Sequence, residues 1–336
     1  MSVDIQKSEA RDGGAWPLRL IRGNAGVAVF VAFIVIATIV SGGRFIQPAN
    51  ISVILFQGSV IGVLALGQTL VMLLAGIDLS IVTVAILAAI VMGAGGSERQ
   101  QMMDMSGILP FLGFLPSIVV ALVGSAAIGF VNGLAIVKLR IPAFIATLAM
   151  SLALSGLAML ATGGSPVHYP DPFYDGFGHA KTLGLPLTVY VYLALAILLA
   201  VFLARSSIGM MIYAIGGNAR TAALSGIPVG RITIFVYALS GLLGGVAGFL
   251  FLARTGSVAP TSGGSLLLNT IASVVIGGVS LYGGKGSVAN AVVGTLLLAG
   301  LGNLMNILLI SPYLQDAVSG LIIVAAIMVN VRLDRG

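Results

Sequence analysis

The stretch that decides the fold is ITIFVYALSGLLGGVAGFLFL, residues 232–252, which runs for 21 residues without a charged side chain. About 20 mostly apolar residues are enough for an α-helix to cross the hydrocarbon core of a bilayer. Arg231 stands directly before the stretch and Arg254 two residues after it. The pattern predicts a transmembrane helix bounded by a basic residue at each end.

The composition of the whole chain agrees with this prediction. The 336 residues are 58% hydrophobic and only 8% charged, whereas soluble domains carry roughly 25% charged residues. The chain is therefore predicted to be an integral membrane protein, and the 46 glycines indicate helices that pack closely through small residues. Because there is no cysteine and the two histidines share one loop, thiolate, disulfide and histidine-based metal or haem sites are not expected.

Nine further apolar segments resemble the first, so we expect an all-α, polytopic membrane helix bundle of about ten transmembrane helices. The range is eight to ten, because 52–75 and 266–282 are interrupted by glycine and could be broken or re-entrant. The ten segments are 25–42, 52–75, 79–95, 112–136, 143–162, 187–204, 232–252, 266–282, 288–309 and 315–331.

The distribution of basic residues predicts the orientation. With ten spans, twelve of the 16 Lys and Arg residues fall on the side of the two termini and four on the other side. The excess marks the cytoplasmic side, so both termini are expected there. We divide the chain into a cytoplasmic tail (1–24), one transmembrane domain (25–331) and a short cytoplasmic tail (332–336); no cleavage site follows the first apolar run, which indicates a retained helix.

Two loops are long enough to carry structure of their own. The outer loop 163–186 contains four prolines and several aromatic residues, which suggests an ordered cap. In the inner loop 205–231, Asn218 is a good helix N-cap and Gly226 a good residue to follow the C-terminus. The intervening sequence predicts a helix of about two turns, which is too short to be stable alone and needs contacts with this chain or with a partner.

The predicted spans hold neutral polar side chains and no ionisable ones away from their ends. Ion-coupled carriers usually place an ionisable group within the membrane, so this pattern favours a path for an uncharged, hydroxyl-rich solute, although neutral side chains of this kind also hydrogen-bond neighbouring helices. Asp78 lies at an inner helix boundary, where it either caps the segment 79–95 or contributes to a gate. The candidate path residues are Gln68, Asn132, Thr147, Asn269, Asn303 and Asn306, of which the last two share a helix face.

One glycine-rich stretch looks like a phosphate-binding loop. In the stretch YGGKGS, residues 282–287, Gly286 stands where a P-loop needs a hydroxyl, and Val279 where it needs the first glycine. We interpret it as a tight turn. No catalytic residue, bound metal or cofactor is therefore assigned to this chain, and any ATP and Mg²⁺ would be bound by a partner.

Several motifs, in this order and spacing, carry a family resemblance along nearly all the chain after residue 45. The chain resembles the permease subunits of bacterial ABC importers of the ribose/galactose type. The motifs are GQTLVM (67–72), AGIDLS (75–80), IPAFIATL (141–148), GSP (164–166), YAIGGN (213–218), SGI (225–227), IASVVIGG (271–278) and GGKG (283–286).

The resemblance implies a role for the inner loop, which in such permeases holds the coupling helix that docks into an ATPase subunit. It also implies a permease dimer, homo- or heteromeric, in the bacterial inner membrane, with the solute path at or near the dimer axis. A soluble binding protein would deliver a monosaccharide, and nucleic acid is not an expected partner. The coupling role is carried over to Gly217, Asn218, Arg220, Ala222, Ala223, Ser225 and Gly226.

Departures from the family pattern concern the solute. Leu267 and Asn269 stand where the family commonly has Glu and Asp, which leaves sugar hydroxyls fewer acceptors or indicates another solute, and Val82 replaces a glycine. A nucleoside, autoinducer or branched-chain amino acid remains an alternative within the same importer class. An ion-coupled carrier is a further alternative, disfavoured by the lack of intramembrane ionisable groups. A membrane enzyme has little support, because no base is visible beside a candidate serine.

Overall fold

A computed structural model describes residues 25–96, 112–169, 172–311, 314–315 and 317–321. Outside this range lie the terminal tails and most of the predicted span 315–331, including residue 316. In the described part, six helices are long and apolar enough to cross a membrane. They are α3 (Pro48–Leu73), α6 (Phe114–Lys138), α7 (Ala143–Thr162), α9 (Leu187–Arg205), α12 (Val229–Thr255) and α14 (Val288–Ile307). The chain is thus an all-α, multi-pass membrane helix bundle.

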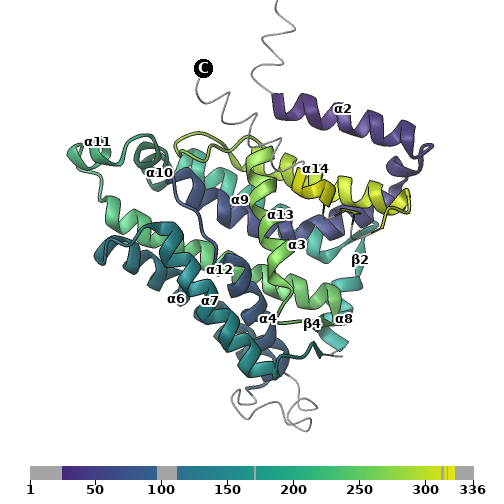
Figure 1. Cartoon of the computed structure of the whole chain (residues 1–336), viewed down its shortest axis with the longest axis horizontal. Coiled ribbons are helices and arrows are strands. Elements are labelled where there is room, and N and C mark those ends of the chain that lie inside the picture. Colours follow the sequence, from purple (N-terminus) through teal and green to yellow (C-terminus); the bar gives the residue numbers. More distant parts are fainter. Residues whose placement is uncertain (1–24, 97–111, 170–171, 312–313, 316, 322–336) are drawn as a thin grey trace, which may run out of the picture.

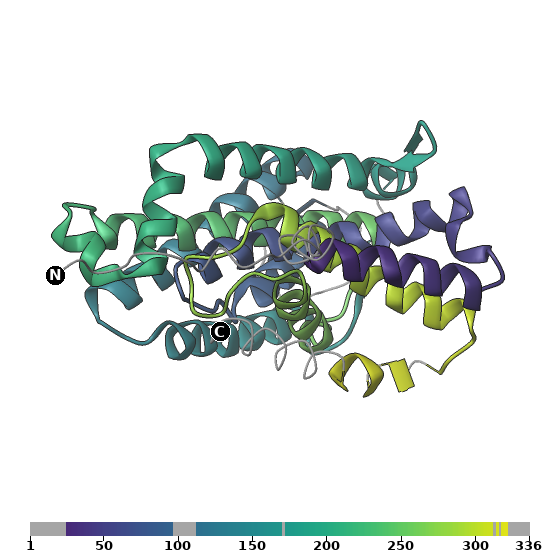
Figure 2. The ribbon, with the colours of Figure 1, turned by 90° about the horizontal axis from the view of Figure 1, so that it is seen from above.

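Two central helices, α3 and α12, organise the bundle (Figure 1). α12 packs against α3, α6 and α4 (Ile81–Gly96), and more than half of the most apolar stretch of α3 and of α12 is buried inside the chain. Figure 2 shows α9 along one side of this central layer and α7 along the other. α2 (Ala25–Val40) lies at the edge and packs against α14, beside the 3₁₀ turn η1 (Arg44–Ile46).

Close packing of α6 on α12 depends on glycine. A Cβ atom on Gly129 of α6 would overlap the backbone carbonyl of Tyr237, and one on Gly241 of α12 would overlap the carbonyl of Ser125. The two helix backbones therefore touch directly, which is the packing that the glycine content predicted.

Of the two glycine-interrupted segments for which a broken or re-entrant form was an alternative, one is a full helix and the other is short. α3 runs unbroken for 26 residues. α13 (Gly263–Ile276) has 14 residues, a length of about 21 Å that is less than the hydrocarbon thickness. It crosses the long helices steeply, standing upright in Figure 1 and end-on in Figure 2, and the turn 277–287 leads from it to α14.

The described parts of the two long loops carry more structure than the sequence indicated. The outer loop contains α8 (Pro172–His179), the hairpin β2 (Lys181–Thr182) and β3 (Leu185–Pro186), and β1 (Val167–His168), which pairs antiparallel with β4 (Ser257–Val258). The inner loop contains α10 (Ser207–Gly217) in addition to the expected short helix α11 (Ala219–Leu224). α10 was missed because its apolar stretch, at 11 residues, is too short for a transmembrane span, and its burial depends on packing against distant helices.

Candidate functional site

The short helix α11 has both of the caps that the sequence predicted. The Asn218 side chain accepts a hydrogen bond from the Thr221 N–H at 2.9 Å, which satisfies a free donor of the first turn. At the other end Gly226 has φ 84, and the N–H of Ile227 donates to the Ala222 carbonyl at 3.1 Å. This is a Schellman motif, so the ends of α11 are fixed by local contacts.

The side chains of α11 divide into a face buried in this chain and a face exposed to solvent. Ala222 is 4% exposed and belongs to the main hydrophobic core, so it anchors α11 to its own bundle. Arg220, Ala223 and Leu224 are exposed, and Leu224 is 83% exposed. A leucine this exposed at the tip of a loop is the feature of α11 that suits contact with another protein.

A second cluster of polar groups surrounds the turn between α3 and α4. The Asp78 carboxylate accepts hydrogen bonds from the N–H and hydroxyl of Ser80 through one oxygen, and from the Ser240 hydroxyl through the other. Asn132 donates to the Ser80 hydroxyl at 2.8 Å, and the Thr147 hydroxyl donates to the Ile77 carbonyl at 3.1 Å. The turn is thereby tied to α6, α7 and α12.

The environment of Asp78 is that of an anchored carboxylate. It lies before the helix start rather than at the N-cap, since α4 begins at Ile81 and the Ser80 carbonyl already accepts the Val84 N–H. Burial raises the pKa of its carboxyl above the usual value, while the hydrogen bonds from Ser80 and Ser240 act in the opposite direction. Two residues, Ser80 and Ser240, supply three donor groups to this carboxylate, which suits a fixed structural link.

The structure separates the six candidate path residues. Asn132 and Thr147 bind the turn described above. Gln68 is fully buried in α3, with neither side-chain amide atom hydrogen-bonded. Asn303 is buried in α14, whereas Asn306 one turn on is exposed and accepts a hydrogen bond from Gln315 at 2.9 Å. Of these two residues, which were predicted to share a helix face, Asn303 thus lies in the core and Asn306 at the surface.

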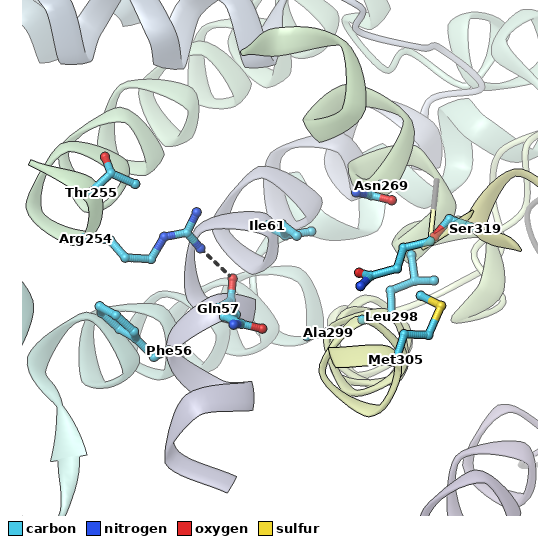
Figure 3. A pocket seen from close by; sticks show the side chains of 12 residues that line it. Phe56, Gln57, Ile61, Arg254, Thr255, Asn269, Leu298, Ala299, Met305 and Ser319 are labelled. Carbon is cyan, nitrogen blue, oxygen red and sulfur yellow. Dashed lines mark hydrogen bonds between the residues drawn. The ribbon is translucent and has the colours of Figure 1, made fainter. Parts of the chain in front are cut away.

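Asn269 lines a cavity of about 480 Å³ between α3, α12, α13, α14 and the segment around Gln315. This volume lies in the range of small-molecule sites. In Figure 3, the Arg254 side chain reaches from the end of α12 toward α3, where its Nη1 donates to the Gln57 carbonyl at 3.0 Å. Asn269 lies across from it in the same view.

The lining of this cavity combines polar groups with apolar side chains. The polar side chains are Gln57, Arg254, Thr255, Asn269, Gln315 and Ser319; none of the described residues that line the cavity is acidic. Phe56, Leu298 and Met305 supply apolar surface. Amides, hydroxyls and a guanidinium are donors and acceptors for a polyhydroxylated solute, and the apolar surface suits its C–H groups.

Sequence reasoning did not identify Arg254 or Gln315 as candidate site residues. Arg254 entered the orientation count as one of four outer basic residues, and its position directly after an apolar span was the available signal. Gln315 carried no local signal, because its contact with Asn306 depends on how the chain returns after α14.

Comparison with known proteins places this geometry in a family. Residues 50–327 match the family model described as "Branched-chain amino acid transport system / permease component". The chain belongs to this permease family. The match covers all the described helices from α4 to α14 and nearly all of α3, so it includes the cavity, the Asp78 turn and α11.

Several relatives of this permease match it over most of their lengths. The ribose import permease protein RbsC of Escherichia coli K12 is 38% identical over 321 residues, which cover 94% of each chain. The D-allose transport system permease protein AlsC of the same organism is 32% identical, covering 98% of this chain and 97% of its own. The fructose import permease protein FrcC of Rhizobium meliloti is 30% identical, covering 90% and 83%. No solved structure matches.

Proposed function

We propose that this chain is the transmembrane permease subunit of an ATP-driven importer in the bacterial inner membrane, and that its solute is a monosaccharide. The observation that carries the proposal is the similarity to ribose, allose and fructose permeases over 90% or more of this chain. The cavity supports it independently, because neutral amides and hydroxyls provide most of its polar lining.

The coupling site of the permease is α11 with its caps. Asn218 and Gly226 hold the helix, Ala222 anchors it, and Arg220, Ala223 and Ser225 stand on its exposed surface beside the linking Gly217. A partner ATPase docks on this surface and binds the ATP and Mg²⁺, so the permease itself carries no cofactor. ATP binding in the partner moves α11, and the movement switches the solute path between the two sides.

The solute path runs along the cavity at Asn269 and continues past the buried amide of Gln68. Both amide atoms of Gln68 lack a hydrogen-bonding partner among the described residues, so a hydroxyl-rich solute or water that reached this position would satisfy them. A second permease copy completes the path, a soluble binding protein delivers the sugar at the outer side, and ten spans leave both termini in the cytoplasm.

A branched-chain amino acid is the second candidate solute, because the description of the family model names that class. An amino acid carries both an ammonium and a carboxylate, and a site for it needs partners for both charges. Arg254 suits the carboxylate, but none of the described residues that line the cavity is an acid to pair with the ammonium. This charge pattern favours the sugar.

The test is uptake by the full-length permease, co-expressed with its ATPase subunit and reconstituted in liposomes. Radiolabelled D-ribose, D-allose, D-fructose and L-leucine are offered with ATP inside or outside the vesicles, with and without the binding protein. ATP-dependent accumulation of one sugar supports the proposal. Accumulation of leucine alone would reassign the solute, and accumulation driven by an ion gradient without ATP would overturn the importer class.

A further inference from the structure

The glycine turn 283–286, which the sequence presents as a failed phosphate loop, is part of a junction of three backbone segments. Its Gly284 N–H donates to the carbonyl of Leu73, the last residue of α3, at 3.0 Å. Its Gly286 carbonyl accepts a hydrogen bond from the Tyr213 hydroxyl of α10 at 2.9 Å. The turn therefore joins the inner ends of α3 and α10.

No side chain fits between these segments. A Cβ atom on Gly216 of α10 would overlap the Leu73 carbonyl oxygen and the Gly284 nitrogen. A Cβ on Gly284 would lie 2.8 Å from the Gly217 nitrogen, and one on Gly283 2.9 Å from the Gly216 carbonyl oxygen. Gly283 and Gly284 also have φ 85 and 68, which glycine adopts most easily. The three backbones touch directly.

Each segment of the junction belongs to an element that matters for coupled transport. Gly216 is two residues before Asn218, the N-cap of α11. Leu73 ends α3, whose Gln57 and Ile61 line the cavity about 20 Å further along the helix. The glycine turn leads into Ser287, the N-cap of α14, whose Leu298 and Met305 line the same cavity.

We propose that Gly216, Gly283 and Gly284 are positioning residues that transmit displacement of α11 to α3 and α14, and so to the walls of the cavity. The inference rests on the proposed function of α11 as the coupling helix. Backbone in direct contact cannot take up a displacement by changing rotamers, as interposed side chains can, because packed atoms resist compression. A push on the end of α10 therefore moves the inner ends of both cavity helices together.

The test compares Gly216→Ala with Gly156→Ala in the full-length permease, reconstituted with its ATPase and binding protein. Gly156 also lies within a helix, α7, but a Cβ there meets no atom within 4 Å, so this variant is the control. The measurements are ATP hydrolysis, uptake of D-ribose, D-allose and D-fructose, and the number of sugar molecules transported per ATP hydrolysed. The wild type in the same assay tests the proposed function separately.

We expect Gly216→Ala to retain ATP hydrolysis while the sugar transported per ATP falls by roughly tenfold, the size of a lost coupling free energy. Gly156→Ala should match the wild type. A merely structural role predicts that hydrolysis and uptake fall in proportion to the amount of folded complex, with an unchanged ratio. That result, or wild-type uptake in Gly216→Ala, overturns the proposal.

A second measurement does not depend on how well a glycine variant folds. Because the chain has no cysteine, spin labels can be attached at introduced cysteines without background. The labels are placed at three exposed positions: Ala214 on α10, Tyr282 beside the turn and Leu152 on α7. When the partner ATPase binds ATP, the distance between the labels at 214 and 282 should stay constant. The distances from each of these labels to the label at 152 should change. A change in the 214–282 distance as large as the others would show that the junction does not move as a unit.

Discussion

The Ser240 hydroxyl of α12 donates a hydrogen bond of 2.9 Å to the buried carboxylate of Asp78, 162 residues away in the chain. The other oxygen of this carboxylate accepts from Ser80, which also receives the amide of Asn132. One acidic side chain thus fixes the turn before α4 to the central helix and to α6. Since both of its oxygens accept hydrogen bonds from the protein, we expect the carboxylate to have a structural role.

The first prediction concerns this link. Ser240→Ala should lower the free energy of unfolding by about 1.5–3 kcal/mol, the usual contribution of a hydrogen bond to a charged group. Asp78→Asn should destabilise the protein less, because the amide oxygen can still accept from the Ser80 N–H and hydroxyl while the amide nitrogen faces the Ser240 hydroxyl, whose oxygen can accept. Thermal unfolding in detergent measures both effects.

Uptake distinguishes this structural role from ion coupling. In the surviving folded fraction, Asp78→Asn should still transport in an ATP-dependent way. If the variant unfolds at the wild-type temperature but loses all transport, and the wild type responds to an ion gradient, then Asp78 binds an ion and the structural interpretation is wrong.

The second prediction separates the two faces of α11. Ala223→Trp places an indole on the exposed face and should prevent co-purification of the ATPase subunit while leaving the unfolding temperature of the permease unchanged. Ala222→Trp places the same group in the core, where overpacking costs about 1–3 kcal/mol, and should lower the unfolding temperature. Equal effects of the two substitutions on ATPase binding, at equal stability, would contradict this division.

The parts of the fold that the sequence predicted well are governed by local interactions. The caps of α11 at Asn218 and Gly226 join residues three to five apart, and α7 occupies the predicted segment 143–162 because a long apolar run between Pro142 and Gly163 has one available structure. The sequence did not predict α10, because Ile212 and Ile215 are buried by helices that are distant in the sequence. The short length of α13 likewise depends on the turn that follows it.

The candidate site was harder to predict, because composition does not reveal which way a polar side chain faces. Asn132, Thr147 and Asn269 are all neutral residues of apolar helices, yet only Asn269 among them lines the cavity. The other two bind the turn at 77–80. The orientation of each is decided by its rotation about the helix axis, which tertiary packing sets.

The third prediction tests the contact of α6 with α12. Gly129→Ala should lower the free energy of unfolding by about 1–3 kcal/mol, because its Cβ would overlap the Tyr237 carbonyl and the helices must separate. Gly124→Ala on the same helix is the control, since a Cβ there meets nothing within 4 Å. That variant should be neutral or stabilised by about 0.5–1 kcal/mol, the helix preference of alanine. Equal unfolding temperatures for the two variants would refute the role given to Gly129.

The fourth prediction concerns the cavity. Asn269→Leu keeps the size of the side chain but removes its hydrogen-bonding groups, so the maximal rate of ATP-dependent sugar uptake should fall by about two- to tenfold, the effect of one net hydrogen bond. The sugar concentration giving half-maximal uptake should stay constant, because the binding protein captures the sugar before the permease meets it. Arg254→Gln should act in the same direction by removing the guanidinium that bridges α12 and α3. Ser265→Ala, at an exposed position of α13 outside the cavity lining, is the control. An Asn269→Leu variant with wild-type maximal rate would exclude the cavity from the solute path.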